Sequence, residues 1–386
     1  MRERIAALVR EMEDAVAARL AAGEAEPGPV ELAALVRERA GAISDGDVLA
    51  VLRALREDTV GAGPLEALLA EPGVTDVLVN GHSEVWVDRG AGLERADSPF
   101  SGEEAVRRLG ARLAAAAGGR LDEAMPFANA RLRRADGSIV RLHAVLSPPA
   151  ERGTCLSFRV LRQAQASLDE LAAGGFLDEV ALRALRGLVA ARRSFLVVGG
   201  TGAGKTTLLS ALLAEADARE RIVCIEDTAE LNPDHPHVVG LVTRRANVEG
   251  TGEITLAELV AQALRMRPDR IVVGEIRGAE IADLLAALNT GHEGGAGTLH
   301  ANSPAEVPAR VEALAALGGL GRDAAHGQFR AGVDAVIHVR RAAGGRRRLA
   351  AIGRVAEGPG GRAVVEPVWQ EGHGALDGLA ELVGER

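Results

Sequence analysis

One stretch of the sequence has the residue types and the spacing of a phosphate-binding loop. It fits the pattern G-x-x-x-x-G-K-[ST], in which glycines let backbone N–H groups turn toward phosphate oxygens and a helix N-terminus adds its positive dipole. In this pattern the lysine, here Lys205, reaches the β- and γ-phosphates, and the following hydroxyl, here Thr206, ligates Mg²⁺. The residues that we expect to bind nucleotide are Gly199, Gly200, Thr201, Gly202, Ala203, Gly204, Lys205, Thr206 and Thr207.

Lys205 is the only lysine among the 45 basic residues of the chain. All the other basic residues are arginines. A chain with this preference is expected to keep a lysine only where a planar guanidinium cannot replace a compact ammonium. The alternative interpretation of this stretch, an ordinary glycine-rich turn at the end of a strand, gives no reason for the lysine to stand there. The position of the single lysine therefore favours the phosphate site.

Acidic side chains are predicted at the ends of two further strands. The run 270–275 is an apolar strand that ends in Glu275, and in P-loop enzymes such a carboxylate orients Mg²⁺ or the attacking water. We therefore expect Glu275 to be the catalytic carboxylate and to hold the metal together with Thr206. Glu226 and Asp227 end another strand, where a ligand crevice of a parallel sheet would lie, although a helix cap explains this pair equally well.

His292 and His300 flank a glycine-rich stretch. A zinc site is not favoured, because no cysteine or further histidine lies close by in the sequence. Imidazoles near a phosphate at the ends of strands can instead sense the γ-phosphate or connect it to a neighbouring element. We expect both histidines to belong to the catalytic site.

Strands and helices that alternate from about residue 167 onward must position these side chains. Apolar strands are expected at 195–198, 221–226 and 270–274, with helices between or after them, which is typical of a parallel sheet with crossover helices. Breaks rich in Gly and Pro divide the rest of the chain. The sequence thus predicts a helical region 1–60, a mixed α/β domain 61–165, a P-loop α/β domain 166–357 and a loose, Gly-rich tail 358–386.

Composition limits the class of protein. The chain has 386 residues, a net charge of −9 and 2% aromatic residues with no tyrosine. A nucleic-acid footprint over the whole protein and a surface for base stacking are both disfavoured by these values. Two cysteines cannot form a disulfide framework, and no run approaches about 18 uncharged apolar residues. We therefore expect a cytoplasmic location with at most peripheral membrane contact.

The motifs together resemble the type II/IV secretion ATPase superfamily, and within it the CpaF-like ATPases of tight-adherence (Tad/Flp) pilus systems. The resemblance covers about residues 61 to 355. Its most specific part is the block 264–277 followed by the stretch 298–302, which contains His300. The stretches that carry the resemblance are 199–207, 225–231, 235–239, 263–277, 288–294 and 298–302.

This resemblance implies a RecA-like P-loop ATPase domain preceded by a smaller mixed α/β domain. It also implies ATP and Mg²⁺ as ligands, a hexameric ring, and inner-membrane platform proteins as partners. No nucleic acid is expected as a partner, because of the net charge and the scarcity of aromatic residues. In the family Glu275 would be the Walker B glutamate, Glu226 and Asp227 the acids of the Asp box, and His292 and His300 the histidines of the His box.

The resemblance further implies that arginines of the N-terminal domain reach the γ-phosphate. Arg131, Arg141 and Arg159 match those positions best. An arginine brought to a transferring phosphoryl group can be worth about 10³–10⁵ in rate. A second arginine cluster, at 340–348 near the end of the P-loop domain, is either a solvated turn or a contact to anionic lipid or an acidic loop.

Three functional hypotheses follow from the sequence. The first is an ATP-hydrolysing motor for secretion or pilus assembly. The second is a DNA-transfer or nucleic-acid motor, which the net charge and the scarcity of aromatic residues disfavour. The third is a nucleotide-gated module with little turnover, which the intact Lys205, Glu275 and His300 disfavour.

Overall fold

The chain divides into two compact units, Met1–Leu161 and Arg162–Arg386. The division lies slightly before the expected domain boundary at 165/166. Much of the expected helical region 1–60 falls outside the described residues, but α2 (Pro29–Ala40) lies within it. The computed structural model describes residues 8, 11–12, 15, 29–41, 43–44, 46–49, 51–52, 61–90, 92–134, 138–161, 166–244, 246, 251–342 and 345–384.

The first unit contains a six-stranded antiparallel sheet in the order β3-β2-β1-β6-β5-β4. Its strands are β1 (Asp76–Asn80), β2 (Val85–Asp88), β3 (Leu93–Ala96), β4 (Phe127–Arg133), β5 (Ile139–Val145) and β6 (Cys155–Leu161). Besides α2, the helices described in this unit are η1 (Gly63–Leu65), α4 (Glu66–Ala70) and α5 (Glu103–Ala116). Alternate side chains of the strands are buried with α5, so one face of the sheet forms the core and the other carries polar residues.

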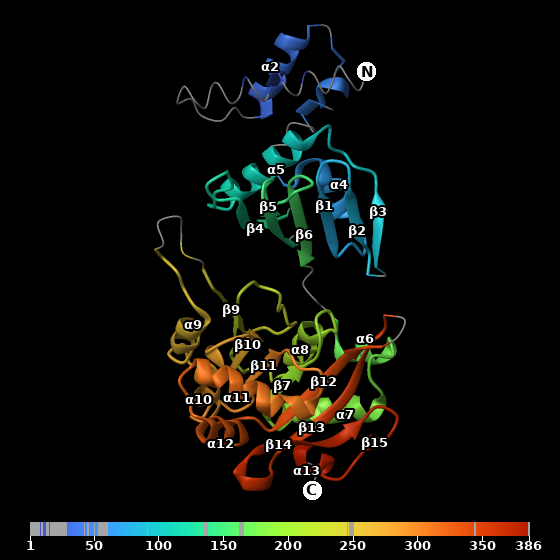
Figure 1. The fold of residues 1–386 in the computed structure, drawn as a ribbon. Coiled ribbons are helices and arrows are strands. Elements are labelled where there is room, and N and C mark those ends of the chain that lie inside the picture. The colour runs from blue at the N-terminus through green and yellow to red at the C-terminus, as the bar shows by residue number, and fades with distance from the viewer. Residues whose placement is uncertain are drawn as a thin grey trace. The chain divides into compact units, whose positions relative to one another are not determined.

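The second unit contains a nine-stranded sheet in the order β15-β14-β13-β12-β7-β11-β10-β8-β9 (Figure 1). The strands from β9 to β12 in this order run parallel, and those from β12 to β15 pair antiparallel. The strands are β7 (Phe195–Val198), β8 (Ile222–Glu226), β9 (Val238–Val242), β10 (Arg270–Ile276), β11 (Ala296–Leu299), β12 (Ala335–Arg341), β13 (Arg347–Glu357), β14 (Ala363–Gln370) and β15 (Gly374–Ala375).

Helices cover both faces of this sheet, which is why its central strands are apolar along their whole length. Phe195 and Val197 of β7 pack with α6, α7 and α8, whereas Leu196 and Val198 pack with α9 to α12. No helix in the described part of the chain is long and apolar enough to cross a bilayer. The helices are α6 (Leu168–Ala173), α7 (Glu179–Ala190), α8 (Lys205–Ala214), α9 (Leu256–Ala263), α10 (Glu280–Leu288), η2 (Pro304–Glu306), α11 (Val307–Leu317), α12 (Arg322–Gly332), η3 (Pro359–Gly361) and α13 (Leu379–Val383).

The expectation of a loose tail after residue 358 is wrong. This segment adds β14 and β15 to the sheet and ends in α13. Val368 and Trp369 of β14 are each 1% exposed, and Leu382 of α13 is buried in the same core. Apolar residues spaced along β14 outweigh the glycines around them, because burying them on the sheet offsets the entropy of ordering the segment.

Candidate nucleotide site

The predicted phosphate loop connects β7 to α8, and its geometry fits a phosphate. Gly204 is the residue before α8 and has φ = 99°, a left-handed conformation that glycine adopts without strain. A side chain at Gly199 is excluded as well, because a Cβ there would lie 2.2 Å from the carbonyl oxygen of Val339. The free N–H groups at the start of α8 are thus available to an anion.

Lys205 is the first residue of α8 and is 7% exposed. Its ammonium donates hydrogen bonds to the carbonyl oxygens of Gly199 and Gly200, at 3.0 and 3.1 Å. Burial lowers the pKa of Lys205, and the negative charge of Glu275 opposes this effect. The ammonium is therefore held inside the loop and lies within electrostatic reach of the candidate catalytic carboxylate.

Glu275 and His300 come together, as the sequence predicts. Because β10 and β11 are parallel neighbours, Glu275 near the end of β10 and His300 just after β11 lie at the same edge of the sheet as the phosphate loop. His300 Nε2 lies 2.7 Å from Glu275 Oε1, and Arg277 donates to the other carboxylate oxygen. Burial alone would raise the pKa of Glu275, but Arg277 and His300 outweigh it, so its pKa is lowered and the carboxylate is ionised at neutral pH.

Glu226 ends β8 beside β10 and is only 5% exposed. Its side chain occupies the space next to Gly274, where a Cβ would lie 2.6 Å from Glu226 Cγ. Its Oε1 accepts hydrogen bonds from the backbone N–H groups of Glu230 and Leu231, both at 3.1 Å. Burial raises the pKa of Glu226 to about 7 even though these hydrogen bonds favour the ionised form.

Glu226→Gln is expected to remove a pH dependence of stability. Between about pH 4.5 and 7 the unfolded chain releases the proton of Glu226 before the folded chain does, so the free energy of unfolding falls as the pH rises. The loss amounts to about 3 kcal/mol over this window and levels off above pH 7. Urea unfolding of wild type and variant at several pH values measures the difference.

A matched control for this experiment is Glu253→Gln, because Glu253 is exposed. Its unfolding free energy should follow that of the wild type at every pH. If the Glu226→Gln curve also runs parallel to the wild-type curve from pH 4.5 to 7, Glu226 is ionised in the folded protein and the argument from its burial fails.

Asp227 lies next to this cluster but is less buried than Glu226. Its Oδ1 accepts a hydrogen bond from the Thr243 hydroxyl at 3.2 Å, and its Oδ2 lies 4.0 Å from Arg277. Arg277 therefore bridges Asp227 and Glu275. Sequence reasoning did not single out Arg277 as a site residue, although its place directly after the strand that carries Glu275 was an available signal.

His292 does not join this cluster. It precedes β11, so it lies at the edge of the sheet opposite the phosphate loop, and its Nδ1 lies 3.2 Å from the carbonyl oxygen of Ala287 near the end of α10. The prediction that His292 and His300 share the site of one chain is therefore wrong. The glycines between them concealed β11, whose length separates the two imidazoles.

Arg131, Arg141 and Arg159 lie directly opposite one another on β4, β5 and β6 of the first unit. Side chains at directly opposed positions share one face of a sheet, so the three arginines form a row. Arg159 also donates to Asp76 at 2.9 Å. That these arginines reach the γ-phosphate stays a prediction.

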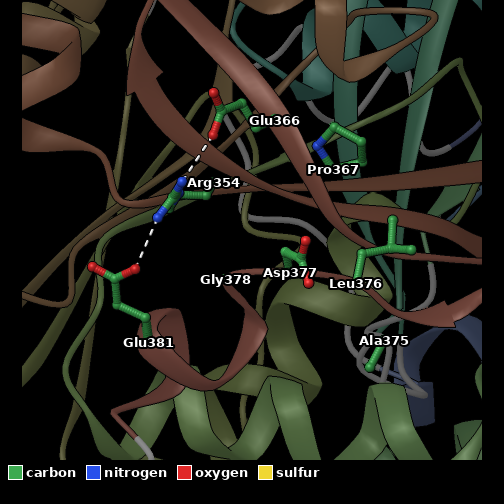
Figure 2. Close-up of a pocket in the computed structure, with 8 residues that line it drawn as sticks. All are labelled: Arg354, Glu366, Pro367, Ala375, Leu376, Asp377, Gly378 and Glu381. Atoms are coloured by element: carbon green, nitrogen blue, oxygen red, sulfur yellow. Dashed lines mark hydrogen bonds and ion pairs between the residues drawn. The ribbon is translucent and has the colours of Figure 1, made fainter.

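A pocket of about 760 Å³ lies apart from the residues of the phosphate site, among β13, β14 and the segment that leads into α13 (Figure 2). Arg354 donates to Glu366 and Glu381, both at 2.9 Å, and Asp377 also lines the pocket. Because its one arginine is already paired and its other charged groups are carboxylates, this pocket does not fit a nucleotide. Its ion pairs instead attach the C-terminal segment to the sheet.

Comparison with known proteins supports the broader of the two resemblances, that to the type II/IV secretion family. A family model described as "Type II/IV secretion system protein" matches residues 58–348. A "Putative conjugal transfer protein" of Mycobacterium tuberculosis is 58% identical over 342 residues, which are 88% of this chain and 97% of that protein. The type IV secretion system protein VirB11 of Brucella suis is 32% identical over 265 residues, which are 62% of this chain and 72% of that protein.

Solved structures support the fold at lower sequence identity. The Legionella pneumophila ATPase DotB aligns with a TM-score of 0.53 at 17% identity, over 76% of this chain and 80% of that one. The pilus retraction motor PilT with bound ADP aligns with a TM-score of 0.52 at 19% identity, over 83% of this chain and 85% of that one. The matched family model, the relatives and the shared fold together establish that this chain belongs to the type II/IV secretion system protein family.

Proposed function

We propose that this chain hydrolyses ATP and uses the energy to drive a secretion, conjugation or pilus-assembly complex of the cell envelope. The observation that carries the proposal is the contact of 2.7 Å between Glu275 and His300 at the edge of the sheet where the Lys205 loop begins α8. A phosphate-binding loop by itself would explain only the binding of a nucleotide and not its hydrolysis. The ionised carboxylate beside it supplies a group that can act on the γ-phosphate.

Each side chain of the cluster has a separate task in this proposal. The Lys205 ammonium, which donates to loop carbonyls in this structure, turns to the β- and γ-phosphate oxygens of the bound nucleotide. Glu275 accepts a hydrogen bond from the attacking water and orients it, and His300 and Arg277 keep the carboxylate ionised and in position. Because the cluster acts through position and charge, it needs no covalent intermediate with the protein.

Mg²⁺ fits the donor atoms that lie at this edge. The Thr206 hydroxyl at the start of α8 and the Glu275 carboxylate are oxygen ligands, which Mg²⁺ prefers, and a bound nucleotide supplies phosphate oxygens. Thr206 and Glu275 are therefore the residues that would hold the ion. The ion would offset the negative charge that the phosphates bring to the loop.

The finer features of the proposal rest on the family resemblance. We infer a hexameric ring at the cytoplasmic face of the inner membrane, platform proteins as partners, and a CpaF-like role in a Tad/Flp pilus. The row Arg131, Arg141 and Arg159 supports the proposed arginine contact, since three neighbouring guanidinium groups form a surface that suits a polyphosphate. Hydrolysis would release these arginines from the γ-phosphate.

A DNA-transfer motor is the second candidate. It is favoured by the description of the 58% identical relative as a conjugal transfer protein. The net charge of −9 and the aromatic content of 2% speak against a grip on DNA by the chain itself. A motor of this family could still act on a membrane complex that carries the DNA.

ATP turnover per subunit, measured against protein concentration with and without DNA, tests the proposal. We expect the rate per subunit to rise with protein concentration and not to change when DNA is added, because sites shared between subunits form only in the assembled ring. A rate that is independent of concentration and is stimulated by DNA would favour the nucleic-acid motor. An absence of turnover at every concentration would contradict the proposed hydrolysis by the chain alone.

A further inference from the structure

The hairpin of β12 and β13 lies against the phosphate loop at two points. The carbonyl oxygen of Val339 on β12 occupies the space beside Gly199 at the start of the loop. At the other end of the loop, a Cβ on Gly204 would lie 3.4 Å from Cδ of Arg347 on β13. The Arg347 side chain therefore runs beside the turn from which α8 begins.

Arg347 is not paired with Glu371, the carboxylate that binds two neighbouring arginines of this hairpin, and no carboxylate partner is recorded for it among the residues that the structure describes. Arg340 and Arg348 donate to the two oxygens of Glu371, at 2.7 and 3.0 Å. Arg341 donates to a carbonyl oxygen of the turn at 3.3 Å. Arg347 is exposed, and its charge is thus available to a ligand.

Phe176, in the connection between α6 and α7, also lies near Gly204. Its Cε2 atom lies 3.4 Å from the same Cβ position on Gly204, and the residue is only 7% exposed. Its carbonyl oxygen accepts a hydrogen bond from the N–H of Leu349 at 2.8 Å, which joins this connection to β13. Arg347 and Phe176 thus both lie near the turn from which α8 begins, and β13 is held to the α6–α7 connection at this point.

The order of the strands gives the direction of a bound nucleotide. β7, which leads into the loop, has β11 on one side and β12 on the other. Glu275 and His300 lie on the β11 side, at the ends of β10 and β11. If the terminal phosphate faces Glu275, the nucleoside end of the nucleotide extends toward β12 and β13, where Arg347 lies.

We propose that Arg347 is a nucleotide-binding residue whose guanidinium pairs with the α-phosphate, at the end of the site opposite Glu275. This inference rests on the proposed ATPase function. A planar guanidinium matches the geometry of a phosphate, and an ion pair of this kind is stronger than a neutral hydrogen bond. ATP and ADP both carry the α-phosphate, so Arg347 contributes equally to the binding of each.

Equilibrium titration of the full chain with fluorescent ATP and ADP analogues, and competition by the unlabelled nucleotides, tests this assignment. Arg347→Ala is expected to weaken both nucleotides by the same factor, about 10- to 100-fold. Arg347→Lys keeps the charge but not the planar fork, and should lose less. The matched control is Arg346→Ala, since Arg346 is also exposed and precedes Arg347 directly, so that an extended chain directs its side chain to the other face.

Each other outcome has a defined meaning. Wild-type affinity for both nucleotides in Arg347→Ala would overturn the assignment and leave the proposed function intact. A loss for ATP without a loss for ADP would place Arg347 at the γ-phosphate and also overturn it. An equal loss of affinity in Arg346→Ala would also overturn the assignment, because the effect would then come from the net charge of the hairpin and not from Arg347 itself. A wild-type chain that binds neither nucleotide would contradict the proposed function first, and the assignment with it.

Discussion

Glu275→Gln is expected to lower ATP turnover by about 10²–10⁴-fold while the chain still binds ATP. Glutamine has nearly the same volume and can keep a hydrogen bond to His300, but it lacks the negative charge that orients the attacking water. The carboxylate is ionised at neutral pH because Arg277 and His300 lower its pKa against the effect of burial. The substitution therefore removes a charge from the reaction without opening a cavity.

Turnover and nucleotide affinity must be measured on the same preparations of this variant. Glu293→Gln is the control, because Glu293 is exposed and precedes β11 at the opposite edge of the sheet. It should retain wild-type turnover. If Glu275→Gln also retains it, the catalytic carboxylate has to be sought elsewhere, with Glu226 as the next candidate.

Lys205→Ala is expected to abolish most nucleotide binding. Loss of a buried charge that pairs with phosphate costs about 2–5 kcal/mol, or about 30- to 5,000-fold in affinity. The variant also removes the ammonium that donates hydrogen bonds to the carbonyl oxygens of Gly199 and Gly200 in the loop. Titration with a fluorescent ATP analogue, together with a thermal unfolding curve, separates lost affinity from lost structure.

Lys205→Arg sharpens this test because it keeps the positive charge. The side chain at this position is 7% exposed and is enclosed by the loop, so a planar guanidinium has no room to make the same contacts. We expect the affinity to fall nearly as far as in Lys205→Ala. Wild-type affinity in the arginine variant would mean that only the positive charge matters at this position. The structure would then give no reason why the chain has a lysine here and not an arginine.

The catalytic cluster was largely predictable from the sequence, because its residues stand where apolar strands end. Glu226 and Glu275 follow runs that are apolar enough to be buried strands, and parallel strands bring their carboxyl ends to one edge. The lysine loop lies at that same edge for the same reason. The buried state of Glu226 was not predictable, since it depends on Gly274 of the neighbouring strand leaving space for the side chain.

The errors have physical causes in glycine-rich segments. β11 contains a glycine and follows two others, so its sequence lacks the apolar run by which a strand is recognised, and His292 was placed beside His300. The C-terminal segment has many glycines as well, yet Trp369 and its neighbours bury enough apolar surface to order it. In both cases long-range packing outweighs the local preference of the chain.

The buried position of the only lysine also makes the chain unusual as a target for amine chemistry. Apart from the α-amino group, Lys205 carries the sole primary amine, and it lies within the phosphate loop with its pKa lowered by burial. An acylating reagent would therefore label one internal position, and a nucleotide in the loop would shield it. The extent of acylation reports directly on how many loops in a population are filled, without any engineered probe.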